Sequence, residues 1–233
     1  MKASASIFLG LFGVAAAANL IAEYLHYQNG IYFSKPLLMI FLGLYLWAST
    51  HGKSRISRWV LFGLAWSMAG DTLLMFNAPG RDYFFLLGLL CFLCAHLCYI
   101  FAFWGYQKNK PGAFAKQPLL ILPFLVFLAG FLFYLWTGIP TALKVPVAVY
   151  STVIIAMSMS CFQLMPKIDS KVFLWLFSGV LLFVLSDSMI ALSKFQTANW
   201  PSPHMHLFIM ITYIAAQYLI ASRTVELAPG ESA

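Results

Sequence analysis

The sequence contains few charged residues. Only 9% of its 233 residues are Asp, Glu, Lys or Arg, whereas 62% are hydrophobic. Soluble globular domains carry about 25% charged residues, so this composition excludes an ordinary soluble domain. Together with a mean hydropathy of +0.84, it predicts an all-α, polytopic membrane protein. The apolar runs are joined by short connections, so we expect one integral membrane domain over residues 1–233.

Acidic residues are especially scarce. Seven Asp and Glu stand against 14 Lys and Arg, for a net charge of +7. On a soluble protein this balance would suggest nucleic acid as a partner. Here the basic residues fall in short loops, where they set membrane topology and attract anionic lipid. We therefore expect membrane lipids as partners and no nucleic acid.

Common catalytic motifs are also missing. The sequence has no HExxH, GxSxG, Walker or dinucleotide-binding motif, which argues against zinc, serine and nucleotide chemistry. Of the four cysteines, Cys91, Cys94 and Cys98 recur on one apolar segment. One helix does not supply a tetrahedral metal site alone, and free cysteines are commonly buried and inert. We predict no metal and no cofactor.

Eight apolar segments remain when the sequence is divided at proline, glycine and charge clusters. Each is close to the roughly 20 residues that cross a bilayer as a helix. We therefore predict a bundle of eight transmembrane helices. The segments cover residues 4–25, 33–50, 56–77, 82–107, 116–137, 141–162, 170–193 and 203–222.

The Lys and Arg residues divide unevenly between the two sides of this bundle. By the positive-inside rule, the richer side faces the cytoplasm and holds both termini. We expect an integral protein of the bacterial inner (plasma) membrane. The richer side carries Lys2, Lys53, Arg55, Arg58, Lys108, Lys110, Lys116, Lys167, Lys171 and Arg223; the poorer side carries Lys35, Arg81, Lys144 and Lys194.

Two aspartates, Asp71 and Asp187, lie inside apolar segments. A charge at the bilayer centre costs about 2.5 to 3.5 kcal/mol on insertion scales, so intramembrane carboxylates usually face a protein interior or a wet cavity and serve a function. The predicted topology puts both in the outer half of the bundle. Glu23, Lys35 and Lys144 are expected in the same half.

The two halves of the chain show a weak internal symmetry. Lys35-Pro36 lies at the start of the second predicted helix, and Lys144 and Pro146 lie at the start of the sixth. Asp71 in the third predicted helix corresponds to Asp187 in the seventh. This pattern is compatible with two parallel four-helix repeats. The alternative is coincidence, because proline near a helix start is common.

The aspartates have a structural and a catalytic interpretation. In the first, they pair with Lys35 and Lys144 and hold helices together. In the second, desolvation and mutual repulsion keep one carboxyl protonated beside an ionised one, which suits acid-catalysed cleavage through an oxocarbenium-like state. Ser186 and Ser188 flank Asp187 and are expected to donate hydrogen bonds to it. His96 has a packing and a catalytic interpretation, and Tyr150, Tyr213 and Gln217 either line the same cavity or bond helices together.

These residues together resemble the YhhN-like family, whose vertebrate members are lysoplasmalogenases. The resemblance covers most of the chain and rests on the order and spacing of the set as a whole. The set comprises Lys35-Pro36, Gly70-Asp71, His96 with Tyr99, Tyr150, Ser186-Asp187-Ser188 with Ala191 and Phe195, and Tyr213 with Gln217.

The resemblance implies a membrane hydrolase that cleaves the vinyl-ether bond of lysoplasmalogen, a lysophospholipid, to a fatty aldehyde and glycerophospho-ethanolamine or -choline. The family's two aspartates fall on Asp71 and Asp187, which are the expected catalytic pair, one acting as acid and the other as base in either order. The expected substrate-binding residues are Lys35, His96, Tyr99, Tyr150, Ser186, Tyr213 and Gln217. The main alternative is a proton-coupled transporter of lipids or small molecules.

Overall fold

The computed structural model describes residues 2–77, 81, 83–196 and 204–231, and within these ranges every regular element is helical. The elements are α1 (Lys2–Tyr24), α2 (Gln28–Thr50), α3 (Arg55–Met75), α4 (Tyr83–Gly105), the short α5 (Ala113–Lys116), the 3₁₀ turn η1 (Pro118–Ile121), α6 (Leu122–Leu135), α7 (Thr141–Phe162), α8 (Ser170–Phe195), α9 (Met205–Leu227) and the 3₁₀ turn η2 (Ala228–Glu231).

Long helices follow directly from the apolar composition, since a backbone in lipid must satisfy its hydrogen bonds within its own segment. In the described residues, seven helices are long and apolar enough to cross a membrane. Helix α3 is of similar length but carries Arg55, Arg58 and Asp71, and it is not among the seven. The chain is thus a multi-pass membrane protein, and the expected number of eight spans depends on α3.

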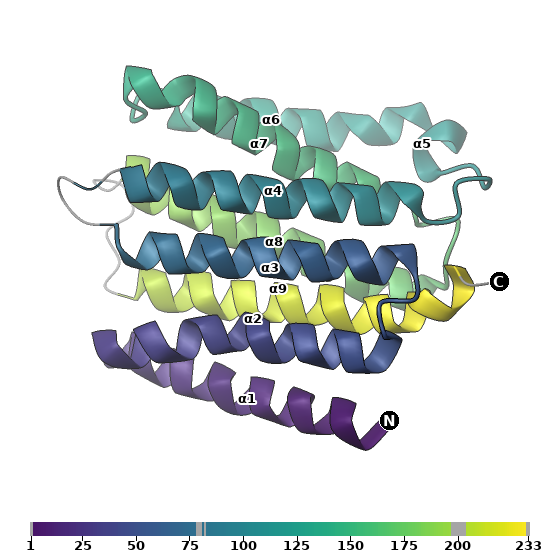
Figure 1. Cartoon of the computed structure of the whole chain (residues 1–233). Helices are drawn as coiled ribbons and strands as arrows, with labels where there is room; N and C mark the ends of the chain where they lie inside the picture. Colours follow the sequence, from purple (N-terminus) through teal and green to yellow (C-terminus); the bar gives the residue numbers. More distant parts are fainter. Residues whose placement is uncertain (1, 78–80, 82, 197–203, 232–233) are drawn as a thin grey trace.

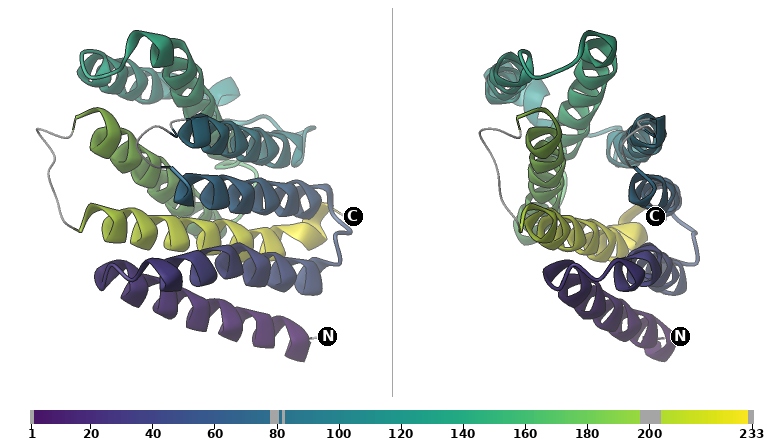
Figure 2. Two further views of the ribbon diagram at one scale, coloured as in Figure 1. Left: turned by 60° about the vertical axis from the view of Figure 1, so that its left-hand side comes forward. Right: turned by 90° about the vertical axis from the view of Figure 1, so that its left-hand side faces the viewer.

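Six helices form a closed ring. Helices α2, α3, α4, α7, α8 and α9 contact one another in that order, and α9 closes the ring on α2 (Figure 2). Helix α1 packs outside the ring on α2 and α9, and α6 packs outside it on α7 and α8 (Figure 1). Polar side chains that face the centre of the ring are therefore shielded from lipid.

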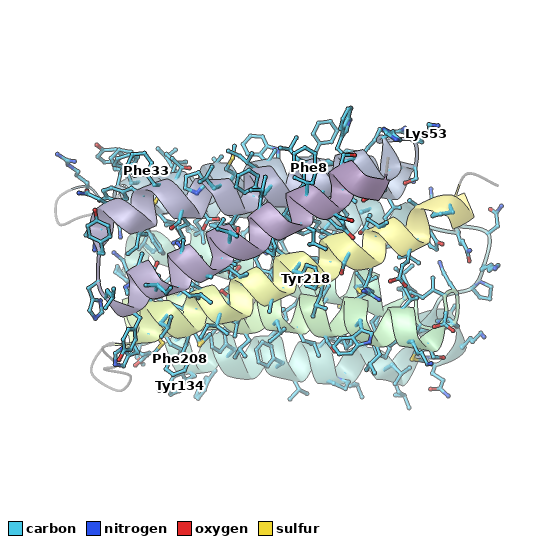
Figure 3. The ribbon with its side chains drawn as sticks, turned by 90° about the horizontal axis from the view of Figure 1, so that it is seen from below. Phe8, Phe33, Lys53, Tyr134, Phe208 and Tyr218 are labelled. Carbon is cyan, nitrogen blue, oxygen red and sulfur yellow. The ribbon has the colours of Figure 1, made fainter. Side chains whose placement is uncertain are left out.

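The two ends of the bundle differ in charge. The first turn of α1 and the last turn of α9 lie at the same end (Figure 1). Lys53 lies at that end too, whereas Phe33, Tyr134 and Phe208 lie toward the opposite one (Figure 3). Because successive long helices run in opposite directions, the predicted basic loops lie at the end that also holds the termini. Below, the end beside the termini is called the basic end and the other the opposite end.

The predicted helix boundaries need three corrections. Helix α2 begins at Gln28, so Lys35 and Pro36 lie two turns inside it and do not open it. The range 116–137 is not one helix, because Gln117 adopts an extended conformation after α5 and Pro118 then begins η1. Helix α9 continues to Leu227 instead of ending at residue 222. The break before Pro118 is local, because the residue that precedes a proline disfavours the helical conformation. The extra turns of α2 and α9 contain residues that are buried against neighbouring helices.

Glycines allow two pairs of helices to approach closely. A Cβ atom on Gly70 of α3 would lie 3.2 Å from the carbonyl oxygen of Gly88 on α4, and one on Gly88 would lie 3.3 Å from that of Gly70. A Cβ atom on Gly179 of α8 would lie 3.1 Å from the carbonyl oxygen of Ala216 on α9. Each close approach lies on a helix that carries one of the aspartates.

The packing is largely equivalent in the two halves of the chain. Helix α2 contacts α3 as α7 contacts α8, and α3 contacts α4 as α8 contacts α9. The contact of α4 with α7 also has a counterpart in that of α9 with α2. This is the pattern that two parallel repeats predict. Duplication of the sequence itself stays a prediction.

Candidate active site

Asp71 lies in the fifth turn of α3, with its side chain turned into the ring. The residue is 3% exposed, and its Oδ2 accepts a hydrogen bond of 2.6 Å from the hydroxyl of Tyr213 on α9. A buried carboxylate needs such donors, since leaving it without a partner is costly.

Asp187 lies at a similar depth on α8, and its side chain is 8% exposed. Its Oδ2 accepts a short hydrogen bond from the hydroxyl of Tyr150 on α7. The same oxygen lies 3.5 Å from Nε2 of His96 on α4. This contact does not have hydrogen-bond geometry, and both ring nitrogens of the fully buried His96 are without a partner in the described residues. The ring nitrogens of His96 therefore remain available to a hydrogen-bonding partner.

Phe183 lies at the centre of these groups. Its ring centroid is 4.9 Å from that of His96 and 5.6 Å from that of Tyr213, both edge-on. It lies one turn before Asp187 on the same face of α8, and its side chain is fully buried. The ring therefore contacts one partner of each aspartate, His96 beside Asp187 and Tyr213 beside Asp71.

A second buried polar chain lies one turn deeper. The hydroxyl of Tyr99 donates to Oε1 of Gln217 at 2.7 Å, and Nε2 of Gln217 donates to the hydroxyl of Ser67 at 3.0 Å. These bonds join α4, α9 and α3. Because all three side chains are satisfied and fully buried, their arrangement can hold the helices that carry Asp71, His96 and Tyr213.

Each aspartate is contacted by a residue from the other half of the chain. Asp71 of the first half is bonded by Tyr213 of the second half, and Asp187 of the second half is approached by His96 of the first. Moreover, His96 follows Asp71 at nearly the same sequence separation as Tyr213 follows Asp187. Tyr99 and Gln217, each about one turn further on, bond to each other. The site thus has approximate twofold symmetry.

An apolar cavity opens beside Asp187. Its walls come from α3, α4, α6, α7 and α8, and the polar residues among its described lining are Tyr150, Ser151, Asp187 and Ser188. Phe127, Leu128 and Phe131 of α6 form one wall. An apolar lining with a few polar groups suits the hydrocarbon chain of a lipid.

A second cavity, with more polar lining than the first, lies toward the opposite end of the bundle. We call it the vestibule. The charged residues among its described lining are Glu23 of α1, Lys35 of α2 and Lys194 of α8. Leu74, Phe85 and Ile190 line both cavities, so these three residues mark a junction between them.

The structure does not support two expectations about neighbours of the aspartates. The hydroxyl of Ser186 donates to the backbone oxygen of Ile209, and that of Ser188 donates to Val184, so neither bonds Asp187. A serine hydroxyl in a helix competes for such backbone carbonyls. Among the described residues, neither aspartate forms an ion pair with a lysine. Lys144 instead lies 4.9 Å from the ring centroid of Trp136.

The remaining predicted residues lie in four places. Tyr150 and His96 contact Asp187, Tyr213 contacts Asp71, and Lys35 lies in the vestibule. Tyr99 and Gln217 lie one turn deeper, where their hydrogen bond joins α4 to α9. In the part of the chain that the structure describes, no three His, Cys, Asp or Glu side chains gather as a metal-binding group. His96 and the two aspartates therefore do not form one.

Sequence reasoning missed the central Phe183 and the vestibule residue Lys194. A phenylalanine in an apolar helix carries no signal of its own, and its place one turn before Asp187 is informative only once the helix face is known. Lys194 was counted as a topology signal. Its position two turns beyond Asp187, on the same side of α8, could have linked it to the site.

A comparison with family models matches residues 30–224 to the YhhN family. The chain belongs to the YhhN family. The matched range contains both aspartates, their Tyr and His partners, Lys35 and Lys194, whereas Glu23 lies outside it.

Several curated YhhN-family relatives are named lysoplasmalogenase. One from Mycobacterium bovis is 31% identical over 177 residues, which are 75% of this chain and 63% of the relative. Human Lysoplasmalogenase TMEM86B is 33% identical over 67% of this chain and 59% of the relative. A Dictyostelium discoideum protein named lysoplasmalogenase homolog is 26% identical over 82% of this chain and 77% of its own length.

The match thus spans about three-fifths of the length of the first two relatives. No solved structure matches this member of the YhhN family.

Proposed function

We propose that this protein is a membrane hydrolase that cleaves the vinyl-ether bond of lysoplasmalogen, releasing a fatty aldehyde and glycerophospho-ethanolamine or -choline. Membership of the YhhN family and the relatives named lysoplasmalogenase support this substrate class. We also propose that α3 spans the bilayer with the other seven helices and that both termini face the cytoplasm, as the excess of Lys and Arg at the basic end favours.

The observation that carries the proposal is the position of Asp187 in the apolar cavity, one turn below the junction with the vestibule. Asp187 and Ile190 are three residues apart on α8 and therefore share a helix face. In a lysoplasmalogen, the vinyl-ether bond joins the hydrocarbon chain to the polar glycerol. A lipid with its chain in the apolar cavity and its headgroup in the vestibule places that bond beside Asp187.

Asp187 is our choice for the proton donor. In its acid form it transfers a proton to the vinyl carbon that is not bonded to oxygen, and the π electrons form the new C–H bond. The adjacent oxygen stabilises the resulting oxocarbenium ion. Asp71, held by Tyr213, supplies the negative charge that stabilises the cation.

Water completes the reaction. The ionised Asp187 accepts a proton from the water that attacks the oxocarbenium carbon, which gives a hemiacetal and restores the acid. The hemiacetal then breaks its bond to the glycerol oxygen, which gains a proton while the hemiacetal hydroxyl loses one. The unpartnered ring nitrogens of His96, near Asp187, are suited to hold this water.

A proton-coupled transporter is the second candidate, because intramembrane carboxylates with a lysine also occur in such carriers. The structure favours the hydrolase in two respects. Helices α3 and α8, which carry the aspartates, are continuous and without internal proline, whereas transporter sites commonly use broken helices. The aspartates also lie about 24 to 26 Å from the basic-end starts of their helices, well past the midplane.

The test is to incubate purified protein in detergent with a lysoplasmalogen and, separately, with an ester lysolipid, and to measure fatty aldehyde and free fatty acid. Wild type should release aldehyde from the first substrate. Asp187→Asn should lower that rate by about 100-fold or more, the usual contribution of a general acid.

Asp169→Asn is the matched control. Asp169 caps the basic-end start of α8, where its side chain accepts from the backbone nitrogens of Lys171 and Val172. Asparagine also caps helices well, so the aldehyde rate should stay within about twofold of wild type. Wild-type protein that releases no aldehyde would refute the proposed function. Full activity of Asp187→Asn would refute the mechanism alone.

A further inference from the structure

We propose that the vestibule is a headgroup subsite in which Glu23 selects a primary ammonium, so that this protein prefers ethanolamine to choline lysolipids. The inference rests on the proposed function for the identity of the reacting bond, but the recognition of the headgroup is argued from the vestibule alone.

Among the described residues that line the vestibule, Glu23 is the only acidic one. It lies in the last turn of α1, is 7% exposed, and follows the buried Asn19 and Ala22 on the inward face of that helix. In the part of the chain that the structure describes, neither Glu23 nor Lys35 forms an ion pair within 4 Å. A carboxylate that is nine-tenths buried and faces a polar cavity without a cationic partner is well placed to bind a cation.

Two lysines provide the complementary anion site. Lys35 lines the vestibule from α2 and Lys194 lines it from α8. Lys194 lies two turns beyond Asp187, about 10 Å further along the axis of α8. Its Nζ is 5.0 Å from the ring centroid of Phe85, which lies at the junction. A phosphate held here lies on the vestibule side of Asp187, where the glycerophosphate part of a lysoplasmalogen extends in our proposal.

The arrangement of charges matches a zwitterionic headgroup. The lysines lie on α2 and α8 and the carboxylate lies on α1, so that a phosphate between the lysines leaves its ammonium directed toward Glu23. A carboxylate accepts hydrogen bonds from a primary ammonium, and such charge-assisted bonds are about twice as strong as neutral ones. A trimethylammonium group has no N–H to donate and is instead recognised by cages of aromatic rings.

Glu23 also lies outside the range that matches the family model, which begins at residue 30. The catalytic groups and both lysines lie inside that range. The family match therefore covers the two lysines of the anion site and not the carboxylate that selects the headgroup in our proposal.

Binding tests the inference without turnover. We would use 1-alkyl-ether lysolipids, which have no vinyl bond to cleave, with ethanolamine, choline or bare phosphate as headgroup, and measure their dissociation constants for the detergent-solubilised protein. Wild type should bind the ethanolamine lipid about three- to tenfold more tightly than either of the others, the range expected for a charge-assisted hydrogen bond. Glu23→Gln should abolish this difference and leave binding of the bare-phosphate lipid unchanged.

Two control variants accompany this experiment. Glu226→Gln makes the same chemical change at the basic end, where Glu226 pairs with Arg223 at 2.6 Å, and should behave as wild type. Lys35→Met should weaken all three lipids together, because each carries the phosphate. Lys144→Met, at the opposite end but over the ring of Trp136, should weaken none.

Equal loss of all three lipids in Glu23→Gln would show a structural role for Glu23 and overturn the inference, as would an unchanged preference for ethanolamine. The same variants are then assayed for aldehyde release from ethanolamine and choline lysoplasmalogens. Selective binding without any aldehyde release would refute the proposed function and leave the headgroup subsite standing. Aldehyde release without selective binding would do the reverse.

Discussion

At the scale of the residue, the site is organised by tyrosines. Each aspartate accepts a hydrogen bond from a tyrosine on another helix, Tyr213 for Asp71 and Tyr150 for Asp187. A tyrosine can satisfy a carboxylate without introducing a second charge into the membrane. It also leaves the other carboxyl oxygen available to a second partner. An ion pair with a lysine would instead neutralise the carboxylate.

The bond between Tyr213 and Asp71 leads to a stability prediction. Tyr213→Phe leaves a buried carboxylate without its donor and should destabilise the protein by about 1 to 3 kcal/mol. For a chain of this size the melting temperature in detergent should fall by about 2 to 4 °C per kcal/mol. Tyr218→Phe, on the same helix with its ring stacked on Phe12, should change it little.

A double-mutant cycle identifies the source of the loss. In an Asp71→Asn background the acceptor is neutral, so the loss on Tyr213→Phe should shrink by about half. An undiminished loss would mean that the hydroxyl acts through something other than Asp71.

At the scale of the element, the α3–α4 pair is the most closely packed. Gly70 and Gly88 face each other, and a Cβ atom on Gly88 would also meet the Cγ of Leu74 at 2.8 Å. Leu74 lies one turn after Asp71 and lines both cavities. The spacing of these two helices therefore determines both the position of Asp71 and the width of the junction. Small residues have this effect in membranes because they let backbones approach.

Gly88→Val tests this spacing. The larger side chain should push α4 from α3 and destabilise the protein by about 1 to 3 kcal/mol, the usual cost of overpacking. Aldehyde release, where the proposed function holds, should fall as well, because the junction is displaced. Both effects are followed by thermal melting in detergent and by the aldehyde assay.

Gly130→Val provides the matched control on α6. A Cβ atom there would meet nothing within 4 Å, so its stability should stay within about 0.5 kcal/mol of wild type. A Gly88→Val protein as stable as Gly130→Val would show that the close approach is not required.

At the scale of the whole molecule, the two ends of the bundle differ in charge and in the function that we propose for them. The basic end carries the loop lysines and arginines. The opposite end carries the vestibule, whose lining lysines, Lys35 and Lys194, are those that the topology count assigned to the poorer side. In our proposal these two lysines bind the phosphate of the lipid. Their positive charge on the poorer side therefore does not contradict the predicted membrane orientation.

Orientation is tested by labelling single cysteines in intact cells. The native Cys91, Cys94, Cys98 and Cys161 are first replaced by alanine. Thr141→Cys, exposed at the opposite end, should then react with a membrane-impermeant maleimide. Lys53→Cys, exposed at the basic end, should react only after the membrane is permeabilised. The reverse pattern would place the vestibule in the cytoplasm and refute the proposed topology.

The sequence by itself determined the helical class, most helix boundaries and the two intramembrane aspartates. These depend on local quantities: apolar length, the need to satisfy backbone hydrogen bonds in lipid, and the rarity of charge at membrane depth. It also identified Tyr150, Tyr213 and His96 through their resemblance to a family. It did not determine which tyrosine meets which aspartate.

Only the tertiary structure decided that pairing, because each pair joins two helices. Tyr213 of the second half meets Asp71 of the first, whereas Tyr150 meets Asp187 from the neighbouring helix α7. The structure likewise directed Ser186 and Ser188 to backbone carbonyls, gave Phe183 its central place, and brought Glu23, Lys35 and Lys194 from three helices to one cavity. Contacts between helices depend on crossing positions and side-chain volumes along the whole bundle, and helical periodicity within one segment does not record them.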